Sequence, residues 1–401
     1  MSRRKPGTAR RTLAVLLAAL IMLSGCSGIL EGERIVTSQH DSPSPDGSEA
    51  DSLTAEDFDS LLAAVRNIVS ARRTSGEINI YSYPAEDGAL DPEMILSEAE
   101  RVRDTLLREN AFCAFSVEDI TFEAATIVSY AQLHVSAAYR RTEAQAAAVV
   151  SVPTVRYLRT RLLDVMSELT ESTVISTTLA SVTAEEIIAA AEEAYYENPA
   201  QIPMLPITEV RMYPEFPPPN AERIFEISFG YSHSVSLLQL SKTQVAETVG
   251  DIARRVSGDS DEEIVYALAG RLAELAEYDS ATASLPDYST QNFSATAYGA
   301  LLEGRAVAEG YAMAMKALCD ELNISCRAVR GTLDGRRRVW NLVTLGGKSY
   351  HLDAAMCDEE GAELYFLRSD ADFAELGYEW AAGLPAAGES SSFVPDAAVD
   401  S

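Results

Sequence analysis

The sequence predicts an α+β protein in which a helix packs on an antiparallel sheet, preceded by one or two small α+β units. The last third of the chain supports this class, because two amphipathic helices are followed there by three runs of strand-forming residues. Two earlier stretches each contain the order helix, strand, strand, helix. Helices and strands grouped in this way are typical of α+β domains.

The first 25 residues are typical of a secretory signal peptide. A basic segment (Arg3–Arg11) precedes an apolar run, Leu13–Leu23, that is too short to span a bilayer. The run ends in Leu23-Ser24-Gly25-Cys26, which resembles the bacterial lipobox. That resemblance implies cleavage before Cys26 and a diacylglyceryl group on its thiol. We therefore expect a lipid-anchored chain at the extracytoplasmic face of a bacterial membrane.

The charge of the chain limits its partners. The formal net charge is −29, with 61 acidic residues against 32 Lys and Arg residues. A nucleic-acid-binding surface needs clustered basic residues, so this balance argues against nucleic acid. The predicted signal peptide contains basic residues and no acidic ones, so its removal would leave the chain more acidic still. We expect no cofactor and no metal site.

Composition divides the rest of the chain into regions. Residues 26–56 are rich in Ser, Asp, Glu, Gly and Pro, which predicts a disordered tether, and residues 384–401 predict a similar tail. Between them we expect an N-terminal α+β region at 57–170, a second α+β region at 178–258 and a C-terminal domain at 259–383.

The two α+β regions contain similar elements. The first is predicted to contain Phe58–Arg73, Ser97–Arg108, Phe115–Tyr130, Gln132–Arg140 and Val155–Leu169. The second is predicted to contain Ala184–Glu197, Ile207–Tyr213, Arg223–Tyr231 and Lys242–Val256. Their shared order leaves open whether they are two copies of one unit. His134 and His233 stand singly in strand-like runs, and we interpret them as packing or surface residues.

The C-terminal domain has the clearest pattern. Its first helix begins with a capping signature, Ser260 followed by Glu263, and a second helix is predicted at about Val307–Leu322. Gly346-Gly347 predicts a two-residue hairpin turn between the last two strands. The three predicted strands are Ile324–Gly331, Val339–Leu345 and Lys348–Asp353.

Several motifs in this domain resemble those of bacterial transglutaminase-like proteins. The segment GRAVAEGYA at Gly304–Ala312 is similar to the family's nucleophile segment, G-x-A-V-C-E-G-Y-A. The segment RVWNLV at Arg338–Val343 is similar to its H-A-W-N-x-V strand, and GKSYHLD at Gly347–Asp353 is similar to its G-K-W-Y-H-V-D strand. Residues 365–370 and 377–380 resemble the usual close of the domain. The resemblance covers about the last third of the chain.

The resemblance implies a papain-like core with a degenerate catalytic triad. By motif position, the nucleophile is replaced by Ala308 and the base by Arg338, whereas the orienting acid is retained as Asp353. Alanine has no lone pair for attack, and arginine stays protonated near neutral pH and cannot accept a proton. We therefore expect a protein without the thiol chemistry of the family.

The hairpin register predicts an ion pair in place of the lost histidine. If Gly346-Gly347 is a two-residue turn, Trp340 faces Asp353, and Arg338 becomes a diagonal neighbour of Asp353 on one sheet face. Their Cα atoms would then lie roughly 7–8 Å apart, which a guanidinium can bridge. The alternative is that Arg338 points into solvent and the pair never forms.

The favoured function is a non-catalytic binding or scaffolding module for a peptide or a cell-envelope component. We expect the ligand between the helix at Ala308 and the strands of Arg338 and Asp353. The residues predicted to line or support this cleft are Trp340, Asn341 and Tyr311.

Two other functions stay open. One is an active thiol peptidase or transamidase that uses Cys319, Cys326 or Cys357 as a non-standard nucleophile. The other is a structural lipoprotein in which the N-terminal two thirds of the chain bind the partner. The disulfide state is also open, because these three cysteines and Cys113 allow three pairings.

Overall fold

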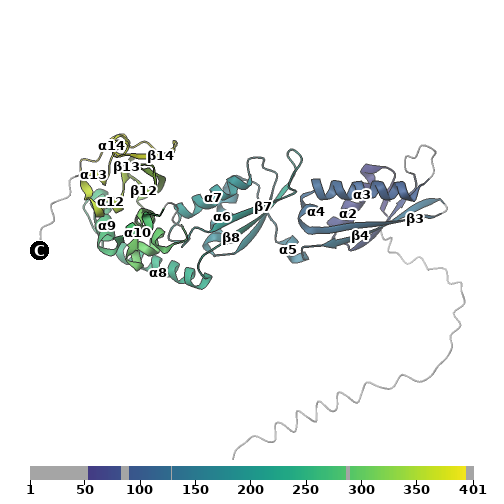
Figure 1. The fold of residues 1–401 in the computed structure, drawn as a ribbon, viewed down its shortest axis with the longest axis horizontal. Coiled ribbons are helices and arrows are strands. Elements are labelled where there is room, and N and C mark those ends of the chain that lie inside the picture. Colours follow the sequence, from purple (N-terminus) through teal and green to yellow (C-terminus); the bar gives the residue numbers. More distant parts are fainter. Residues whose placement is uncertain (1–52, 83–89, 128, 286–289, 394–401) are drawn as a thin grey trace, which may run out of the picture. The chain divides into compact units, whose positions relative to one another are not determined.

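The computed structural model describes residues 53–82, 90–127, 129–285 and 290–393. The predicted signal peptide at 1–25, Cys26 and most of the predicted tether at 26–56 lie outside these residues. The described chain forms three four-stranded sheets with their covering helices, and one short two-stranded pair (Figure 1). None of its helices is both long enough and apolar enough to cross a membrane.

The first sheet has the strand order β1-β2-β4-β3. The pair β1–β2 is parallel, and the other neighbours are antiparallel. Because Leu53–Ala55 pairs with β2 and Ala55 is buried, the predicted tether ends earlier than residue 56. The elements are β1 (Leu53–Ala55), α2 (Phe58–Ser70), β2 (Ser75–Ile80), α3 (Pro92–Glu109), α4 (Ala111–Ser116), β3 (Val117–Ile127) and β4 (Tyr130–Tyr139).

The second sheet repeats this topology. Its order is β5-β6-β8-β7, with β5–β6 parallel and the other neighbours antiparallel. Apart from the additional short helix α4 in the first region, both regions have the chain order strand, helix, strand, helix, strand, strand, and they share one topology. After the linking helix α5 (Glu143–Ala147), the elements are β5 (Val150–Ser151), α6 (Val155–Ser167), β6 (Ser172–Thr177), α7 (Ala184–Glu197), β7 (Ile207–Tyr213) and β8 (Arg223–Gly230).

The predicted boundary between the two regions is shifted in the structure. The helix α6 had been assigned to the region 57–170, but it connects β5 to β6 and belongs to the second sheet. A parallel pair needs such a crossover helix. The strand β5 has two residues, too few for an alternating pattern, so no sequence pattern indicates that a new sheet begins at Val150.

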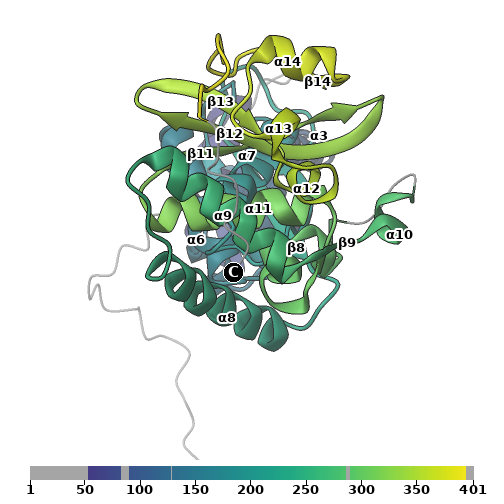
Figure 2. The ribbon, with the colours of Figure 1, turned by 90° about the vertical axis from the view of Figure 1, so that its left-hand side faces the viewer.

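The C-terminal domain contains a four-stranded antiparallel sheet of order β13-β12-β11-β14. Figure 2 shows α9 and α11 on one side of this sheet and α14 on the other. The main elements are α8 (Val235–Ala253), α9 (Asp261–Leu275), α11 (Ala308–Glu321), β11 (Ser325–Leu333), β12 (Arg336–Leu345), β13 (Lys348–Leu352) and β14 (Tyr378–Trp380). The short elements are β9 (Glu277–Tyr278), α10 (Ser280–Ala283), η1 (Phe293–Ala295), η2 (Gly299–Glu303), β10 (Arg305–Ala306), α12 (Ala354–Glu359), α13 (Ala362–Tyr365) and α14 (Asp370–Glu375).

The hydrophobic cores divide the chain differently from the sheets. The first sheet and its helices bury a core of their own. The second sheet shares one continuous core with α8, α9, α11 and the inner face of the C-terminal sheet. The helix α8, predicted as part of the region 178–258, contributes Val245 and Val249 to this shared core and packs against α11. The second region and the C-terminal domain are therefore joined by apolar burial.

The chain beyond residue 384 is ordered further than predicted. Ala387 is buried, the amide of Ser391 donates to the carbonyl of Leu367, and the ring of Phe393 packs beside Tyr266. These contacts correct the prediction of a disordered tail for residues 384–393, whereas residues 394–401 lie outside the described chain.

Candidate functional site

Ala308 begins the helix α11, at the position expected for a nucleophile. Its side chain is buried, and the preceding Val307 donates its amide to the carbonyl of Ser294. Gly310 permits close packing here, because a Cβ at this position would lie 2.4 Å from the Ser294 carbonyl oxygen. No side chain caps the first turn of α11. Its amide groups can therefore still donate to a bound oxygen, although Ala308 offers no attacking atom.

The predicted ion pair between Arg338 and Asp353 is present. The hairpin register is confirmed from Leu345–Lys348 to Asn341–Leu352, and both turn glycines have positive φ, as a two-residue turn requires. Arg338 donates from Nε to Asp353 Oδ2 at 2.7 Å and from Nη2 to Oδ1 at 3.0 Å. The pair is bidentate, and both side chains are buried.

Further hydrogen bonds fix the Asp353 carboxylate. It accepts from the Tyr378 hydroxyl at 2.8 Å and, as the N-cap of α12, from the Met356 amide at 3.1 Å. Burial of the Arg338 guanidinium disfavours its charged form, but the adjacent Asp353 carboxylate outweighs burial and raises the pKa of Arg338. Arg338 therefore stays a cation and cannot serve as a general base.

Ala308 and Arg338 border one cavity of about 560 Å³, a volume within the usual range of ligand pockets. The first turn of α11, the beginning of β12 and the segment around α10 enclose it. Its lining residues are Tyr278, Ser280, Ala283, Ser284, Val307, Ala308, Leu333, Asp334, Arg336, Arg337 and Arg338. The cleft predicted between the helix at Ala308 and the strand of Arg338 therefore corresponds to a real cavity.

The three predicted cleft residues do not line this cavity. Trp340, Asn341 and Tyr311 are at most 1% exposed. Asn341 donates to the Ala312 carbonyl and ties β12 to α11. The Tyr311 hydroxyl lies 2.7 Å from both the Ala276 carbonyl oxygen and Asp358 Oδ2, and it donates to one of them. Their motif positions suggested a place at the cleft, but their side chains point into the interior and support the site from behind.

Glu309 forms a buried contact that the sequence analysis missed. This side chain is fully buried next to Ala308, and its carboxylate accepts from the Tyr196 hydroxyl at 2.6 Å and from Arg337 Nη2 at 2.7 Å. Burial, followed by the charge of Glu309, raises the pKa of Tyr196, which therefore stays a hydroxyl donor. Because Tyr196 lies on α7, the second α+β region helps to hold the beginning of α11. An acidic residue within an apolar helix face was the only sequence signal for this contact.

A second missed network contains a histidine. The Trp340 indole Nε1–H donates to His351 Nδ1 at 2.9 Å, and His351 Nε2 lies 2.8 Å from Asp370 Oδ1. Because Nδ1 accepts a hydrogen bond from the indole, the neutral ring carries its hydrogen on Nε2, and this N–H donates a hydrogen bond to Asp370. His351 is fully buried and stacks on Phe373 at 4.8 Å. It is therefore closed off from the cavity beside Ala308.

The environments of the cysteines disfavour thiolate formation at three of the four described positions. Burial raises the pKa of the Cys113 thiol to about 11. A hydrogen bond with Cys326, together with burial, raises the pKa of Cys319. Burial, followed by the charge of Asp353, raises the pKa of Cys357. All four described cysteines, including Cys326, are free thiols.

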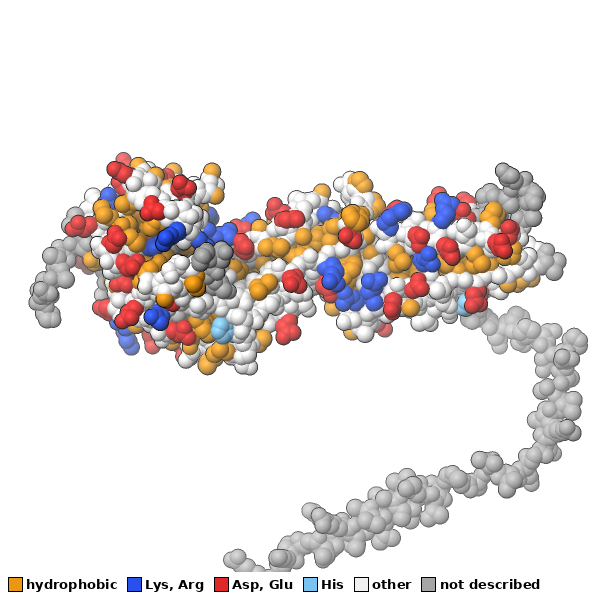
Figure 3. Space-filling model, in the orientation of Figure 1, with side chains coloured by type: hydrophobic (Ala, Val, Ile, Leu, Met, Phe, Trp, Pro, Cys, Tyr) orange, Lys and Arg blue, Asp and Glu red, His pale blue; other side chains and the backbone are white. Residues whose placement is uncertain are grey.

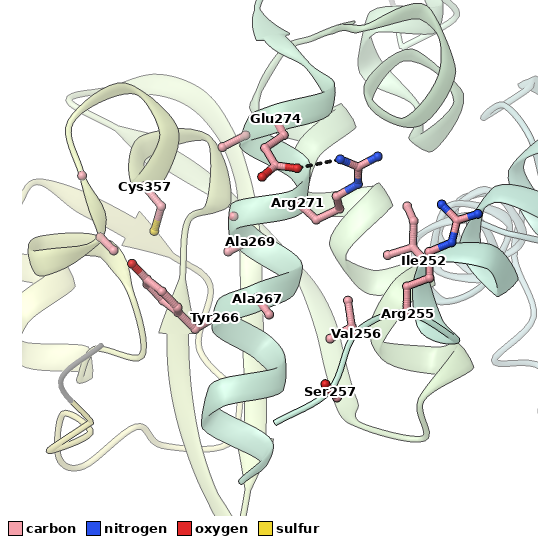
Figure 4. A pocket seen from close by; sticks show the side chains of 14 residues that line it. Ile252, Arg255, Val256, Ser257, Tyr266, Ala267, Ala269, Arg271, Glu274 and Cys357 are labelled. Carbon is pink, nitrogen blue, oxygen red and sulfur yellow. Dashed lines mark hydrogen bonds and ion pairs between the residues drawn. The ribbon is translucent and has the colours of Figure 1, made fainter. Parts of the chain in front are cut away.

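Cys357 borders a different cavity, of about 820 Å³, that the sequence analysis did not anticipate. Figure 4 shows Cys357 and Tyr266 on one side of α9, and Arg255 and Val256 at the end of α8 on the other. The dashed line in Figure 4 marks the ion pair between Arg271 and Glu274, at 2.6 Å. No histidine lines this cavity, so a thiolate formed at Cys357 would have no imidazole there to accept its proton.

Charged side chains are unevenly distributed over the surface of the protein. Acidic side chains are spread over the face shown in Figure 3, and basic side chains gather in a few groups on it. Within the described ranges, no group of three or more His, Cys, Asp or Glu residues is arranged to hold a metal ion.

Comparison with known proteins identifies the C-terminal domain. Residues 250–360 match the family model of the transglutaminase-like superfamily, whereas no curated protein matches the chain. A structure described as a TGase has 10% identity and a TM-score of 0.25, and the alignment covers 65% of this chain and 71% of that one.

Two other solved structures are similar at the same low level. A candidate cysteine protease from Cytophaga hutchinsonii has 12% identity and a TM-score of 0.23, with 46% of this chain and 65% of that chain covered, so the match spans less than two thirds of that protein. A candidate protease from Parabacteroides distasonis has 6% identity and a TM-score of 0.21, with 69% and 40% covered. The family match confirms the α+β, papain-like fold predicted for the last third of the sequence. The chain carries a transglutaminase-like domain over residues 250–360.

Proposed function

We propose that this protein is a lipid-anchored, extracytoplasmic binding module whose transglutaminase-like domain has lost catalysis. The observation that carries the proposal is the state of the two reactive positions. Ala308 supplies no nucleophile, and Arg338 is committed to a bidentate ion pair with the retained acid Asp353. Covalent acyl transfer needs both a nucleophile and a proton acceptor, so the loss of the pair removes the whole route.

The alternative of a displaced nucleophile has less support. Three of the described cysteines have raised pKa values, which lowers the thiolate fraction at neutral pH. The described part of the domain contains one histidine, His351. It is buried, and both of its ring nitrogens already take part in hydrogen bonds. A cysteine enzyme would need a thiolate and an accessible imidazole together.

Binding is supported by what the site has kept. The cavity beside Ala308 has the volume of a ligand pocket, and its walls are fixed by the Arg338–Asp353 pair and by Glu309. A preorganised cavity loses little conformational entropy when a ligand enters. We propose an extended peptide or another envelope component as the ligand.

The catalytic part of the proposal is tested by restoring the family residues. Iodoacetamide labelling of the wild-type ectodomain is expected to be slow at every cysteine. The double variant Ala308→Cys/Arg338→His should gain one fast-labelling thiol, because a cysteine at a helix N-terminus beside an imidazole has a lowered pKa. The single variant Ala308→Cys, with Arg338 retained, is the matched control. Amide hydrolysis by the wild type that disappears in Cys357→Ser would refute the loss of catalysis.

The binding part is tested by filling the cavity. Ser284→Trp places a bulky side chain on its wall, whereas Ser236→Trp makes the same change on the exposed surface of α8, outside it. Retention of envelope peptides by the intact lipidated protein should fall in Ser284→Trp and persist in Ser236→Trp. Equal retention by both variants would exclude this cavity as the ligand site.

The anchor is tested separately at its predicted position. Metabolic labelling with an alkyne fatty acid should mark the wild type and leave Cys26→Ser unlabelled, since Cys26 is the only residue of the lipobox-like segment that can form the thioether. Labelling that persists in the variant would contradict this anchor.

A further inference from the structure

The cavity beside Ala308 has a wall of three consecutive arginines. Arg336, Arg337 and Arg338 all line it, at the beginning of β12. Asp334 is the one acidic residue among the lining residues, and its Oδ1 would lie 2.6 Å from a Cβ built on Gly377, so it is turned toward that glycine. Three guanidinium groups around one cavity are notable in a chain with a net charge of −29.

The three arginines differ in how far they are neutralised. Arg338 is paired with Asp353, and Arg337 is paired with Glu309. Glu309 and Asp353 are at most 1% exposed, and neither lines the cavity. Arg336 is exposed and has no ion pair with any described residue. One guanidinium is therefore available to a ligand, which suits a group with a single negative charge.

Hydroxyl groups line the same cavity as the arginines. Tyr278, Ser280 and Ser284 line the cavity, and Arg338 Nη1 lies 3.4 Å from the Tyr278 hydroxyl. Ala283, Val307 and Ala308 supply apolar surface between the polar groups. Such a wall can hold the charged end of a ligand at the arginines while a short apolar side chain packs on the alanines.

We propose that this cavity binds the terminal carboxylate of a short peptide, with Arg336 as the charge partner and the Tyr278 hydroxyl as an additional donor. This inference rests on the proposed function and specifies its ligand. The unpaired charge of Arg336 favours a monoanionic carboxylate over a phosphate, which carries close to two negative charges near neutral pH. The buried pair Arg338–Asp353 holds the wall in place.

The test compares two probes that differ only in this charge. N-acetyl-alanyl-alanine and its C-terminal amide are titrated by calorimetry into the full ectodomain. The free acid should bind at least about tenfold more tightly than the amide, since a hydrogen bond to a charged group is worth about 1.5–3 kcal/mol. Arg336→Gln should weaken binding of the acid by about the same factor and leave binding of the amide unchanged. Arg255→Gln is the matched control, because Arg255 is exposed and lines the other, larger cavity; it should change neither affinity.

Each contrary outcome overturns the inference in a recognisable way. If the acid and the amide bind equally well and Ser284→Trp abolishes the binding of both, the cavity binds peptides but does not recognise a terminal carboxylate. If Arg255→Gln abolishes binding of the acid and Arg336→Gln does not, the acid binds in the cavity bordered by Arg255 and Cys357. Tighter binding of methyl phosphate, dependent on Arg336, would replace the carboxylate by a phosphate. Absence of binding by either peptide at millimolar concentration would refute the inference, while retention of envelope peptides by the wild type would still support the proposed function.

Discussion

Two side-chain networks lie on the same strands of the C-terminal sheet, and only one of them contains a histidine. The first joins Arg338 to Asp353 at the edge of a cavity, and the second joins Trp340, His351 and Asp370. The second network has the imidazole and carboxylate that a thiol enzyme needs, yet it has no nucleophile and its imidazole is fully buried. The position of a histidine–acid pair therefore decides its role more than its presence does.

The two networks also differ in charge. The first is a cation held against an anion, and its bidentate geometry offsets part of the cost of burying both. In the second, burial lowers the pKa of His351, although the Asp370 carboxylate acts in the opposite direction. His351 is therefore a neutral hydrogen-bonding residue. This contrast predicts a large response to removal of one partner in the first network and smaller responses in the second.

The largest effect is expected from Asp353→Ala. This change leaves the Arg338 cation buried without its counter-charge, and it also removes the N-cap of α12. Breaking a buried pair on one side costs about 3–5 kcal/mol in the free energy of unfolding. Urea denaturation followed by circular dichroism measures the loss.

The matched control for this prediction removes both charges. Arg338→Met/Asp353→Asn keeps the side-chain oxygen that accepts from the Met356 amide, and the Tyr378 hydroxyl, which donates to the other carboxylate oxygen in the wild type, can instead accept from the Asn amide. The double variant should recover most of the stability lost in Asp353→Ala, because no unpaired charge stays buried. If Asp353→Ala costs less than about 1 kcal/mol, the pair behaves as a solvent-exposed one and the contrast between the two networks fails.

A smaller loss is expected from Trp340→Phe in the second network. The variant removes the donor to His351 Nδ1 and leaves a buried acceptor unsatisfied, which costs about 1–3 kcal/mol, in addition to the volume lost from the core. Trp380→Phe is the control, because the Trp380 ring also contacts His351, at 4.7 Å, without a hydrogen bond to it among the described contacts. Equal losses in the two variants, measured by urea denaturation, would show that packing alone holds His351.

The sequence predicted contacts best between residues whose separation is set by one hairpin or one helix. Gly346-Gly347 determines the register of β12 and β13, and that register alone predicts Arg338 beside Asp353. The motif positions likewise located Ala308 at the beginning of α11. In these cases, neighbours along one hairpin or one helix suffice to predict the contact.

Contacts between distant segments could not be predicted in the same way. One partner of Glu309 is Tyr196, which is separated from it by 113 positions, and their contact depends on how α7 packs against the C-terminal domain. Trp340 had the motif position of a cleft residue, but its side chain points toward Phe373, in a core formed only when the segment after β13 folds back. The strands β5 and β1 escaped detection because two or three residues carry no periodic pattern.

The smallest effect concerns pH and follows from the neutral state of His351. Burial holds the pKa of this imidazole below the value of 6.5 that it has in the unfolded chain, so the unfolded state binds more protons as the solution is acidified. The stability that His351 contributes is therefore complete above about pH 6.5 and is lost as the pH falls toward its folded-state pKa, with a slope of at most about 1.4 kcal/mol per pH unit. The informative quantity is the difference in unfolding free energy between the wild type and His351→Gln, because groups that titrate alike in both proteins cancel in this difference. That difference should shrink on acidification from about pH 7 to about pH 5, since only the wild type carries this imidazole. A difference that grows on acidification would mean that His351 is protonated beside the Asp370 carboxylate in the folded protein, and the second network would then be charged like the first.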